Sequence, residues 1–197
     1  VGELVAMQRL TSEDNARIHA AVLDVERDAN TDFAVQVVRL SDRYVLFPLL
    51  WAGVIALLAG AAIAVFRPEL GLRIGIAIEA AVFTVASLAL DWLPLRLMLV
   101  PKRHKYAQAR ALAHRAFASK ILADDDPRPG VLFFVSIGER YVEVITERTV
   151  KARIDDAVWE TIVADFVRTA GGGRLADGVL AAVKASGAVL KQHFPKT

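Results

Sequence analysis

The sequence predicts an α/β domain with an inserted two-helix transmembrane hairpin, and three observations lead to this fold class. An apolar run from Tyr44 to Phe66 carries no charge and exceeds the roughly 18 to 20 residues needed to cross a hydrocarbon core of about 30 Å. A second apolar run follows the turn Arg67-Pro68-Glu69. Only six of the 46 charged residues lie between 44 and 100, so the remainder of the chain has the charge density of a soluble domain.

The segment before the apolar runs predicts one helix and one strand. Thr11 or Ser12 is the expected N-cap, because acidic residues follow in the first turn, where the helix dipole favours them. Apolar residues then recur at helical spacing and give the helix one apolar face: Ile18, Val22, Val25 and Ala29. The β-rich run from Phe33 to Leu40 predicts a largely buried strand.

The segment after Pro101 predicts a helix, a β-hairpin and two further helices. The helix runs to about Leu122, and its expected inward residues are Tyr106, Ala109, Ala113, Phe117 and Ile121. Residues 131–137 and 141–147 flank Gly138-Glu139-Arg140, which is a strong hairpin signal. Helices are expected at about 155–169 and 174–193, with Gly171-Gly172-Gly173 as a flexible linker between them.

The expected domain organisation has three parts. Residues 1–43 form the first part of the domain, residues 44–100 form the hairpin with spans at about 45–66 and 74–93, and residues 101–197 complete the domain. Lys and Arg residues flank the outer ends of the spans more densely than the short loop, which holds only Arg67 and Arg73. The positive-inside rule therefore predicts a cytoplasmic domain and an external loop.

Small residues line one side of each predicted span. They recur every four residues and permit close helix approach: Ala52, Ala56, Gly60 and Ala64 in the first span, Gly71 and Gly75 in the second. Their plain role is packing of one helix on the other, and a second role is self-association or docking on another membrane protein. Glu79 continues this spacing, and a carboxyl inside a span normally finds a partner. Hydrogen bonding between helices or subunits is its expected role, ahead of a proton or ion pathway.

The basic residues next to the spans predict contact with lipid. Anionic headgroups account for Arg43, Lys102, Arg103 and Lys105 without nucleic acid as a partner. Histidines are scattered and form no ligand pair at helical spacing, and the absence of cysteine excludes disulfides and thiol ligands. The run Asp124-Asp125-Asp126 predicts a solvated loop rather than a cation site.

Asp155 and Asp156 form the best acid pair in the chain, and two roles are open for them. They stand at the start of a predicted helix, where an N-cap and a first-turn acid are expected. The other role is a metal or catalytic site, in which the pair takes Ca²⁺ or Mg²⁺.

Several short motifs occur in an order that resembles the TPM-domain family. The resemblance covers nearly the whole chain and rests on these motifs: Leu10-Thr11-Ser12-Glu13, Ser41-Asp42-Arg43-Tyr44, Gly130–Ser136, Glu139–Glu143, Trp159, Arg174–Gly178 and His193-Phe194-Pro195. It is closest to the bacterial membrane-anchored branch, which is related to thylakoid-lumen proteins of photosystem II repair. It implies a compact α/β sandwich and a multi-pass protein of the bacterial cytoplasmic (inner) membrane.

The resemblance implies two competing functions. Some members are described as phosphatases or calcium binders with acids beside a glycine-containing loop after the last strand. The corresponding segment here, Thr146–Asp156, has the acids but no glycine, and Arg148, Lys151 and Arg153 oppose a cation.

We therefore expect a binding or assembly module without a cofactor, rather than an enzyme. Its partners would be membrane lipids and either a second copy or another membrane protein, whose complex it helps to maintain or assemble. The alternative is a metal-dependent phosphatase or calcium-binding domain that uses Asp155 and Asp156. A third class, a transporter or channel component, would need oligomerisation around Glu79.

Overall fold

Strand β2 (Gly130–Ser136) is buried along its whole length, and the α/β part of the chain is built around it. In this computed structural model, which describes residues 10–122 and 128–196, β2 pairs in parallel with β1 (Asp32–Val38) and antiparallel with β3 (Tyr141–Thr146). The sheet order is β1-β2-β3. The antiparallel pair confirms the β-hairpin predicted at Gly138-Glu139-Arg140.

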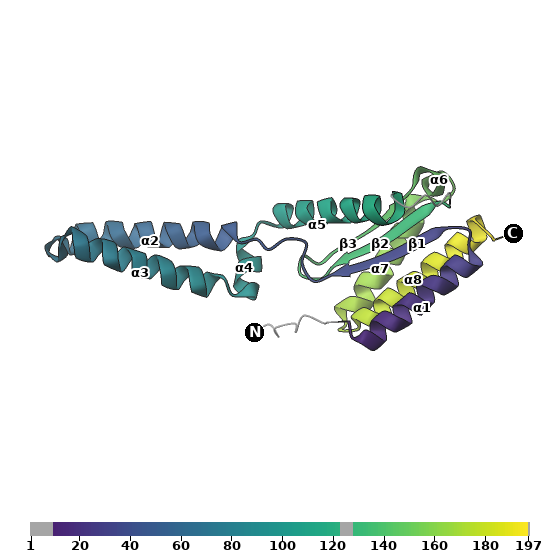
Figure 1. Cartoon of the computed structure of the whole chain (residues 1–197), viewed down its shortest axis with the longest axis horizontal. Helices are drawn as coiled ribbons and strands as arrows, with labels where there is room; N and C mark the ends of the chain where they lie inside the picture. Colours follow the sequence, from purple (N-terminus) through teal and green to yellow (C-terminus); the bar gives the residue numbers. More distant parts are fainter. Residues whose placement is uncertain (1–9, 123–127, 197) are drawn as a thin grey trace. The chain divides into compact units, whose positions relative to one another are not determined.

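Helices cover both faces of this sheet (Figure 1). One face packs against α5 (Lys102–Phe117) and the π-helical turn η2 (Ala118–Leu122), through alanines and Phe117. The other face packs against α1 (Ser12–Asp28), α7 (Asp156–Gly171) and α8 (Leu175–His193), which share the larger core. Alternate residues of β2 serve the two cores, because successive side chains of a strand point to opposite faces. Phe133 faces the larger core, and Phe134 faces α5.

The connection from β1 to β2 carries a helical hairpin. Helix α2 (Leu46–Phe66) leads through the 3-10 turn η1 (Pro68–Leu70) into α3 (Gly71–Leu90), and a short helix α4 (Leu93–Leu99) precedes α5. By its contacts the chain divides into two units, residues 42–105 and the remainder. A mixed helical and α/β architecture was predicted and is confirmed, with a three-stranded sheet.

The boundaries of α3 differ from the prediction of 74–93 at both ends. Gly71 has φ +68°, a left-handed conformation that glycine adopts without strain, so α3 starts directly after η1. At the other end Pro94 has no N–H to donate to Leu90, and its ring would clash with that carbonyl. The chain therefore leaves the helix at Asp91 and begins α4 with Pro94 in its first turn.

Three other expectations are corrected. Tyr106 was expected to face inward but is 46% exposed, while Ala109, Ala113, Phe117 and Ile121 are buried. The three glycines are an ordered helix end rather than a flexible linker, because Gly172 N–H donates to the Thr169 carbonyl and Gly173 N–H to the Ala170 carbonyl at 3.2 and 3.1 Å. The short helix α6 (Arg148–Lys151) follows β3 in a segment for which no helix was predicted. Asp124-Asp125-Asp126 lies outside the described residues.

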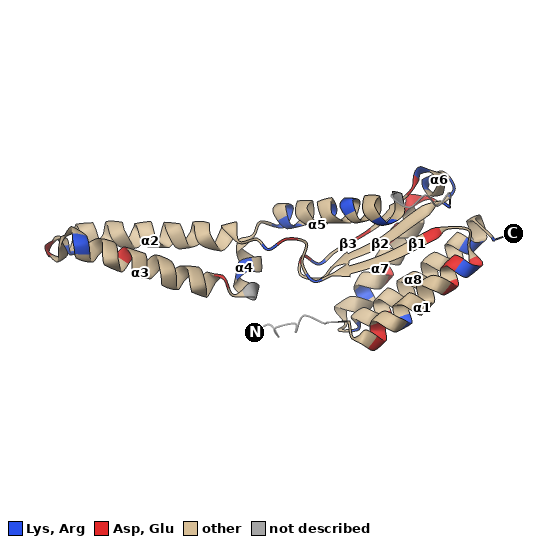
Figure 2. Ribbon diagram, in the orientation of Figure 1, with Lys and Arg blue, Asp and Glu red and all other residues tan. Residues whose placement is uncertain are grey.

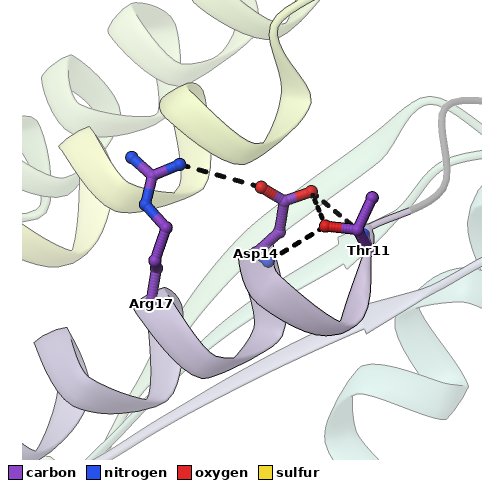
Figure 3. A network of polar contacts seen from close by, with 3 residues as sticks. All are labelled: Thr11, Asp14 and Arg17. Atoms are coloured by element: carbon purple, nitrogen blue, oxygen red, sulfur yellow. Dashed lines mark hydrogen bonds and ion pairs between the residues drawn. The ribbon is translucent and has the colours of Figure 1, made fainter.

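The N-terminus of α1 is fixed by a capping box, and the predicted N-cap is Thr11 (Figure 3). The Thr11 hydroxyl accepts from Asp14 N–H at 3.1 Å, and the Asp14 carboxylate accepts from Thr11 N–H at 3.0 Å and from its hydroxyl at 2.8 Å. Arg17 lies 3.8 Å from the other carboxylate oxygen. The hydrogen bond from the Thr11 backbone holds the pKa of Asp14 below its ordinary value of 3.8.

We expect Thr11→Ala to lower the free energy of unfolding by about 1 kcal/mol, the usual effect of removing an N-cap hydroxyl. Because the pKa of Asp14 is lowered in the folded state, its charge stabilises the fold above pH 3.8, and this contribution is lost as the pH falls through the folded-state pKa. The Thr11→Ala deficit should therefore be larger at pH 7 than at pH 3 in denaturant unfolding of the detergent-solubilised chain. Ser12→Ala is the matched control, and an equal deficit in both variants would contradict the capping role.

Candidate functional site

Helices α2 and α3 expose apolar side chains along most of their length. Both are long and apolar enough to span a bilayer, and in the most apolar 18 residues of each only 11% and 0% of the residues are buried. Their large side chains face outward at exposed fractions of 65% or more at several positions: Leu46, Leu50, Leu57, Leu58, Val65, Phe66, Leu72, Val85 and Leu88. Figure 2 shows that charged residues are sparse on both helices. An exposed apolar surface of this extent is typical of a site that contacts lipid or another protein.

Small residues form the contact between the two helices. Ala52, Ala56 and Ala86 are buried at that contact, and Gly60 faces α3. A Cβ placed on Gly75 would lie 3.9 Å from Ile63 of α2. Ala64, by contrast, is exposed, and Gly71 has open space around it and serves the turn. Of the six predicted small residues, four therefore lie at the contact between α2 and α3, and Ala64 and Gly71 do not.

Glu79 lies directly over Gly60. A Cβ built on Gly60 would be 3.0 Å from the carboxyl carbon and from one carboxylate oxygen of Glu79, so the missing side chain makes room for the carboxyl group. Glu79 is neither fully buried nor fully exposed. In the part of the chain that the structure describes, no hydrogen bond or ion pair is formed by its carboxylate. The structure thus brings Glu79 and Gly60 together and gives Glu79 no donor.

Arg96 of α4 ties together the base of the hairpin. Its guanidinium donates to the Arg43 carbonyl at 2.8 Å, to the Asp91 carbonyl at 2.9 Å and to the Asp91 carboxylate. The Arg96 side chain is 15% exposed, so these bonds are partly shielded from water. Arg43 precedes α2 and Asp91 ends α3, and one side chain therefore joins the entry, the exit and the short helix.

Aromatic contacts complete the base. Tyr44 is buried and has φ +50°, which is uncommon for a bulky residue. The His104 ring lies edge-on to both Tyr44 and Phe47, with centroid distances of 6.2 and 5.2 Å. Lys105 is partly buried and donates to the Leu97 carbonyl at 3.0 Å. The other predicted headgroup residues, Arg43, Lys102 and Arg103, are exposed.

Asp155 and Asp156 are both exposed, and each has a partner within the chain. Asp155 is the N-cap of α7, and its carboxylate accepts from Ala157 N–H at 2.8 Å. Asp156 pairs with Lys151 Nζ at 3.0 Å. Among residues 10–122 and 128–196, no three Asp, Glu or His side chains are grouped as metal ligands. A cation at the acid pair would have to displace a helix N–H and an ammonium group.

A shallow cleft of about 440 Å³ opens beside the segment that precedes α7, and the charged side chain in its lining is positive. It is lined by Asn30, Pro129, Thr149, Ala152, Arg153, Phe194 and Pro195. The Arg153 guanidinium stacks on the Phe194 ring at 4.7 Å from its centroid and donates to the His193 carbonyl at 3.2 Å. The charged side chain in this lining is therefore basic, and basic side chains suit an anionic group better than a metal ion.

A buried polar cluster at the turn between β2 and β3 was not predicted as a site. Glu139, only 3% exposed, accepts from Ser41 N–H at 2.8 Å and from the Ser136 hydroxyl, which in turn accepts from the Ser41 hydroxyl at 3.0 Å. Gly138 also lies so close to Arg39 and Leu40 that a Cβ there would be 2.9 Å from the Arg39 carbonyl. The turn between β2 and β3 thus holds the segment that leads from β1 toward α2.

We expect Glu139→Ala to destabilise the domain by about 1–3 kcal/mol, because Ser41 N–H and the Ser136 hydroxyl would be left buried without an acceptor. Glu139→Gln keeps one acceptor oxygen and should cost less. Urea unfolding of the detergent-solubilised chain measures both. Glu160→Ala, an exposed acid on α7, is the control, and a Glu139→Ala variant as stable as this control would contradict the anchoring role.

A second cluster of titratable side chains joins α5 and β3. The Tyr141 hydroxyl donates to Glu143 at 2.8 Å, and Arg110 and His114 lie 3.9 and 3.8 Å from the other Glu143 oxygen. Burial, together with the hydrogen bond to Glu143, raises the pKa of Tyr141 above its ordinary value. The pairing was not predicted, because its members are about 30 residues apart in the sequence.

Comparison with known proteins places this arrangement in context. The family model described as TPM domain matches residues 78–189, which is more than half of the chain. The solution NMR structure of the BA42 protein from the psychrophilic bacterium Bizionia argentinensis superposes with a TM-score of 0.57 at 13% identity. That alignment covers 96% of this chain and 87% of BA42, and at this identity it bears on the fold alone. No curated protein matched the chain.

Proposed function

The chain belongs to the TPM-domain family, and from that membership we propose that it is a membrane-anchored TPM module that holds a partner protein at the membrane. The observation that carries the proposal is the uncovered apolar surface of α2 and α3. Leaving one large aliphatic side chain in water rather than burying it costs about 1.5–3 kcal/mol, and at least nine are exposed here. Lipid removes this cost and suits helices of 21 and 20 residues.

The distribution of charge supports one orientation in this proposal. The base of the hairpin carries Arg43, Lys102 and Arg103 as exposed cations. At the opposite end of the described hairpin the basic residues are Arg67, which pairs with Glu69 at 2.6 Å, and Arg73. The positive-inside rule then puts the α/β domain in the cytoplasm and the η1 turn outside a bacterial inner membrane. The exposed cations of the base would lie at anionic headgroups.

Cysteine accessibility tests both membrane insertion and orientation. The chain has no cysteine, so Glu69→Cys at the turn and Glu160→Cys on α7 each give a single reporter. In intact spheroplasts a membrane-impermeant maleimide should label Glu69→Cys at once and Glu160→Cys only after the membrane is disrupted. Release of the chain by alkaline carbonate, or equal labelling of both sites, would contradict the proposal. The reverse labelling pattern would overturn the orientation.

The proposed role is assembly or maintenance of a membrane protein complex by binding, rather than catalysis. The two acids of the competing phosphatase or calcium-binding hypothesis are occupied by Ala157 N–H and Lys151. Calorimetric titration of the purified chain with Ca²⁺ and Mg²⁺ separates the two hypotheses. Saturable binding that is lost in an Asp155→Ala/Asp156→Ala variant, together with metal-dependent hydrolysis of a phosphate ester, would favour the enzyme.

A further inference from the structure

The carboxyl group of Glu79 lies near the middle of α3. With a rise of about 1.5 Å per residue, Glu79 is about 12 Å from Gly71 and about 16 Å from Leu90. If the hairpin spans a bilayer as proposed above, the group lies well inside the hydrocarbon core. A charged or strongly polar group at that depth costs several kcal/mol unless it is paired.

No donor of the same hairpin reaches this carboxyl in the described structure. The Thr84 hydroxyl donates to the Ala80 carbonyl of its own helix at 2.9 Å. Ser87 is eight residues away, or about 12 Å along the helix, and its hydroxyl has no partner among the described residues. Arg73 is about 9 Å away in the opposite direction, toward the turn. The described residues therefore supply no donor to Glu79, and another molecule is left to do so.

The contact with Gly60 keeps the carboxyl at the helix pair without covering it. Gly60 brings no side chain to that contact, and Glu79 remains partly exposed along the flank of the hairpin. A helix that lay along this flank could approach the carboxyl closely, since Gly60 stands in the run Ala59–Ala62 of small residues on α2.

We propose that Glu79 is a docking residue for a transmembrane helix of another protein, one that carries a lysine or arginine at the same depth. This inference rests on the proposed membrane anchoring. Charge complementarity argues against a second copy as the occupant. In a two-fold dimer about the membrane normal, equivalent residues meet at equal depth, so a second copy would bring another carboxyl, which can pair with Glu79 only when one of the two is protonated. A lysine or arginine instead gives a carboxylate both a hydrogen bond and an opposite charge.

The test uses two synthetic helices as probes, because the natural partner is unidentified. One is a polyleucine transmembrane peptide with a single central lysine, and the other has leucine at that position. The full chain, labelled at Glu160→Cys, is reconstituted in phosphatidylcholine vesicles, and energy transfer to labelled peptide is measured. We expect the lysine peptide to bind at least tenfold more tightly than the leucine peptide.

Three variants test whether Glu79 causes the preference for the lysine peptide. Glu79→Leu should abolish it, and Glu79→Gln, which keeps the shape of the side chain but not its charge, should weaken it. Thr84→Leu on the same helix is the control and should leave it unchanged. Equal binding of both peptides, or a preference that survives in Glu79→Leu, overturns the proposal. Transfer between copies of the chain that is lost in Glu79→Leu, without a response to the lysine peptide, also overturns it and assigns Glu79 to self-association.

This design separates failure of the inference from failure of the anchoring. If the chain does not enter the vesicles, the membrane proposal fails, and the docking role fails with it. If the chain enters the vesicles and is protected as the cysteine labelling requires, but shows no preference for the lysine peptide, only the role of Glu79 is overturned.

Discussion

With α2 in the bilayer as proposed, Leu58→Arg is expected to shift its insertion equilibrium by more than a hundredfold. Leu58 is 66% exposed and lies about 18 Å from Leu46 and about 12 Å from Phe66, close to the centre of the helix. An arginine at the centre of a transmembrane helix costs about 2.5–3.5 kcal/mol, and the favourable transfer of leucine is lost as well. Each 1.4 kcal/mol changes an equilibrium tenfold.

The measurement is the fraction of the chain that resists alkaline carbonate extraction. Leu46→Arg is the matched control, because Leu46 is 72% exposed on the same helix but lies at its end, where a long basic side chain reaches the interface. We expect Leu46→Arg to remain in the membrane fraction. Equal extraction of the two variants would mean that protein rather than lipid covers α2.

The elements with strong local signals were predicted from the sequence. Helix α1 begins at Thr11 because the capping box is formed by residues three positions apart, and both partners are visible in the sequence. The β2–β3 hairpin was marked by Gly138 between two β-rich runs, and the pairing confirms it. The membership of the TPM-domain family was also recognised from ordered motifs and is confirmed.

Short elements and distant contacts could not be predicted in the same way. Helix α6 has only four residues, too few for helical periodicity to show. Tyr106 occupies an inward helical position by spacing, but it lies near the start of α5, where its ring contacts Tyr141 at a centroid distance of 5.8 Å instead of entering the core. The spacing of apolar residues along a helix does not show which of its turns lie over the sheet, so the exposure of Tyr106 could not be predicted.

The buried cluster around Glu139 shows why sites are harder to predict than elements. Ser41 and Glu139 are 98 positions apart, and nothing local to either residue indicates the other. The sequence predicted close approach of α2 and α3 through small residues and a hydrogen bond from Glu79 between helices or subunits, but not the contact of Glu79 with Gly60. Only the tertiary structure shows that the Glu79 carboxyl lies against Gly60 and that the described residues supply it with no donor.

Phe133→Ala is expected to lower the free energy of unfolding by about 3–5 kcal/mol, the usual range for removing a buried phenylalanine. Phe133 is fully buried in the central strand, and its ring meets Phe166 of α7 edge-to-face with a centroid distance of 5.4 Å. The same core holds Ile18 and Val25, which come before the helical hairpin in the chain. Phe133 therefore joins the two parts of the domain that the hairpin separates in the sequence.

Urea unfolding of the full chain in detergent tests this prediction. A Trp51→Phe/Trp92→Phe background leaves Trp159, which is buried in the same core, as the only fluorescent indole. Val167→Ala, 53% exposed on α7, is the control and should change stability by no more than about 0.5 kcal/mol. A Phe133→Ala variant as stable as this control would show that the residues before and after the hairpin do not share one cooperative core. A loss in the expected range would mean that the domain reassembles around β2 despite the insertion.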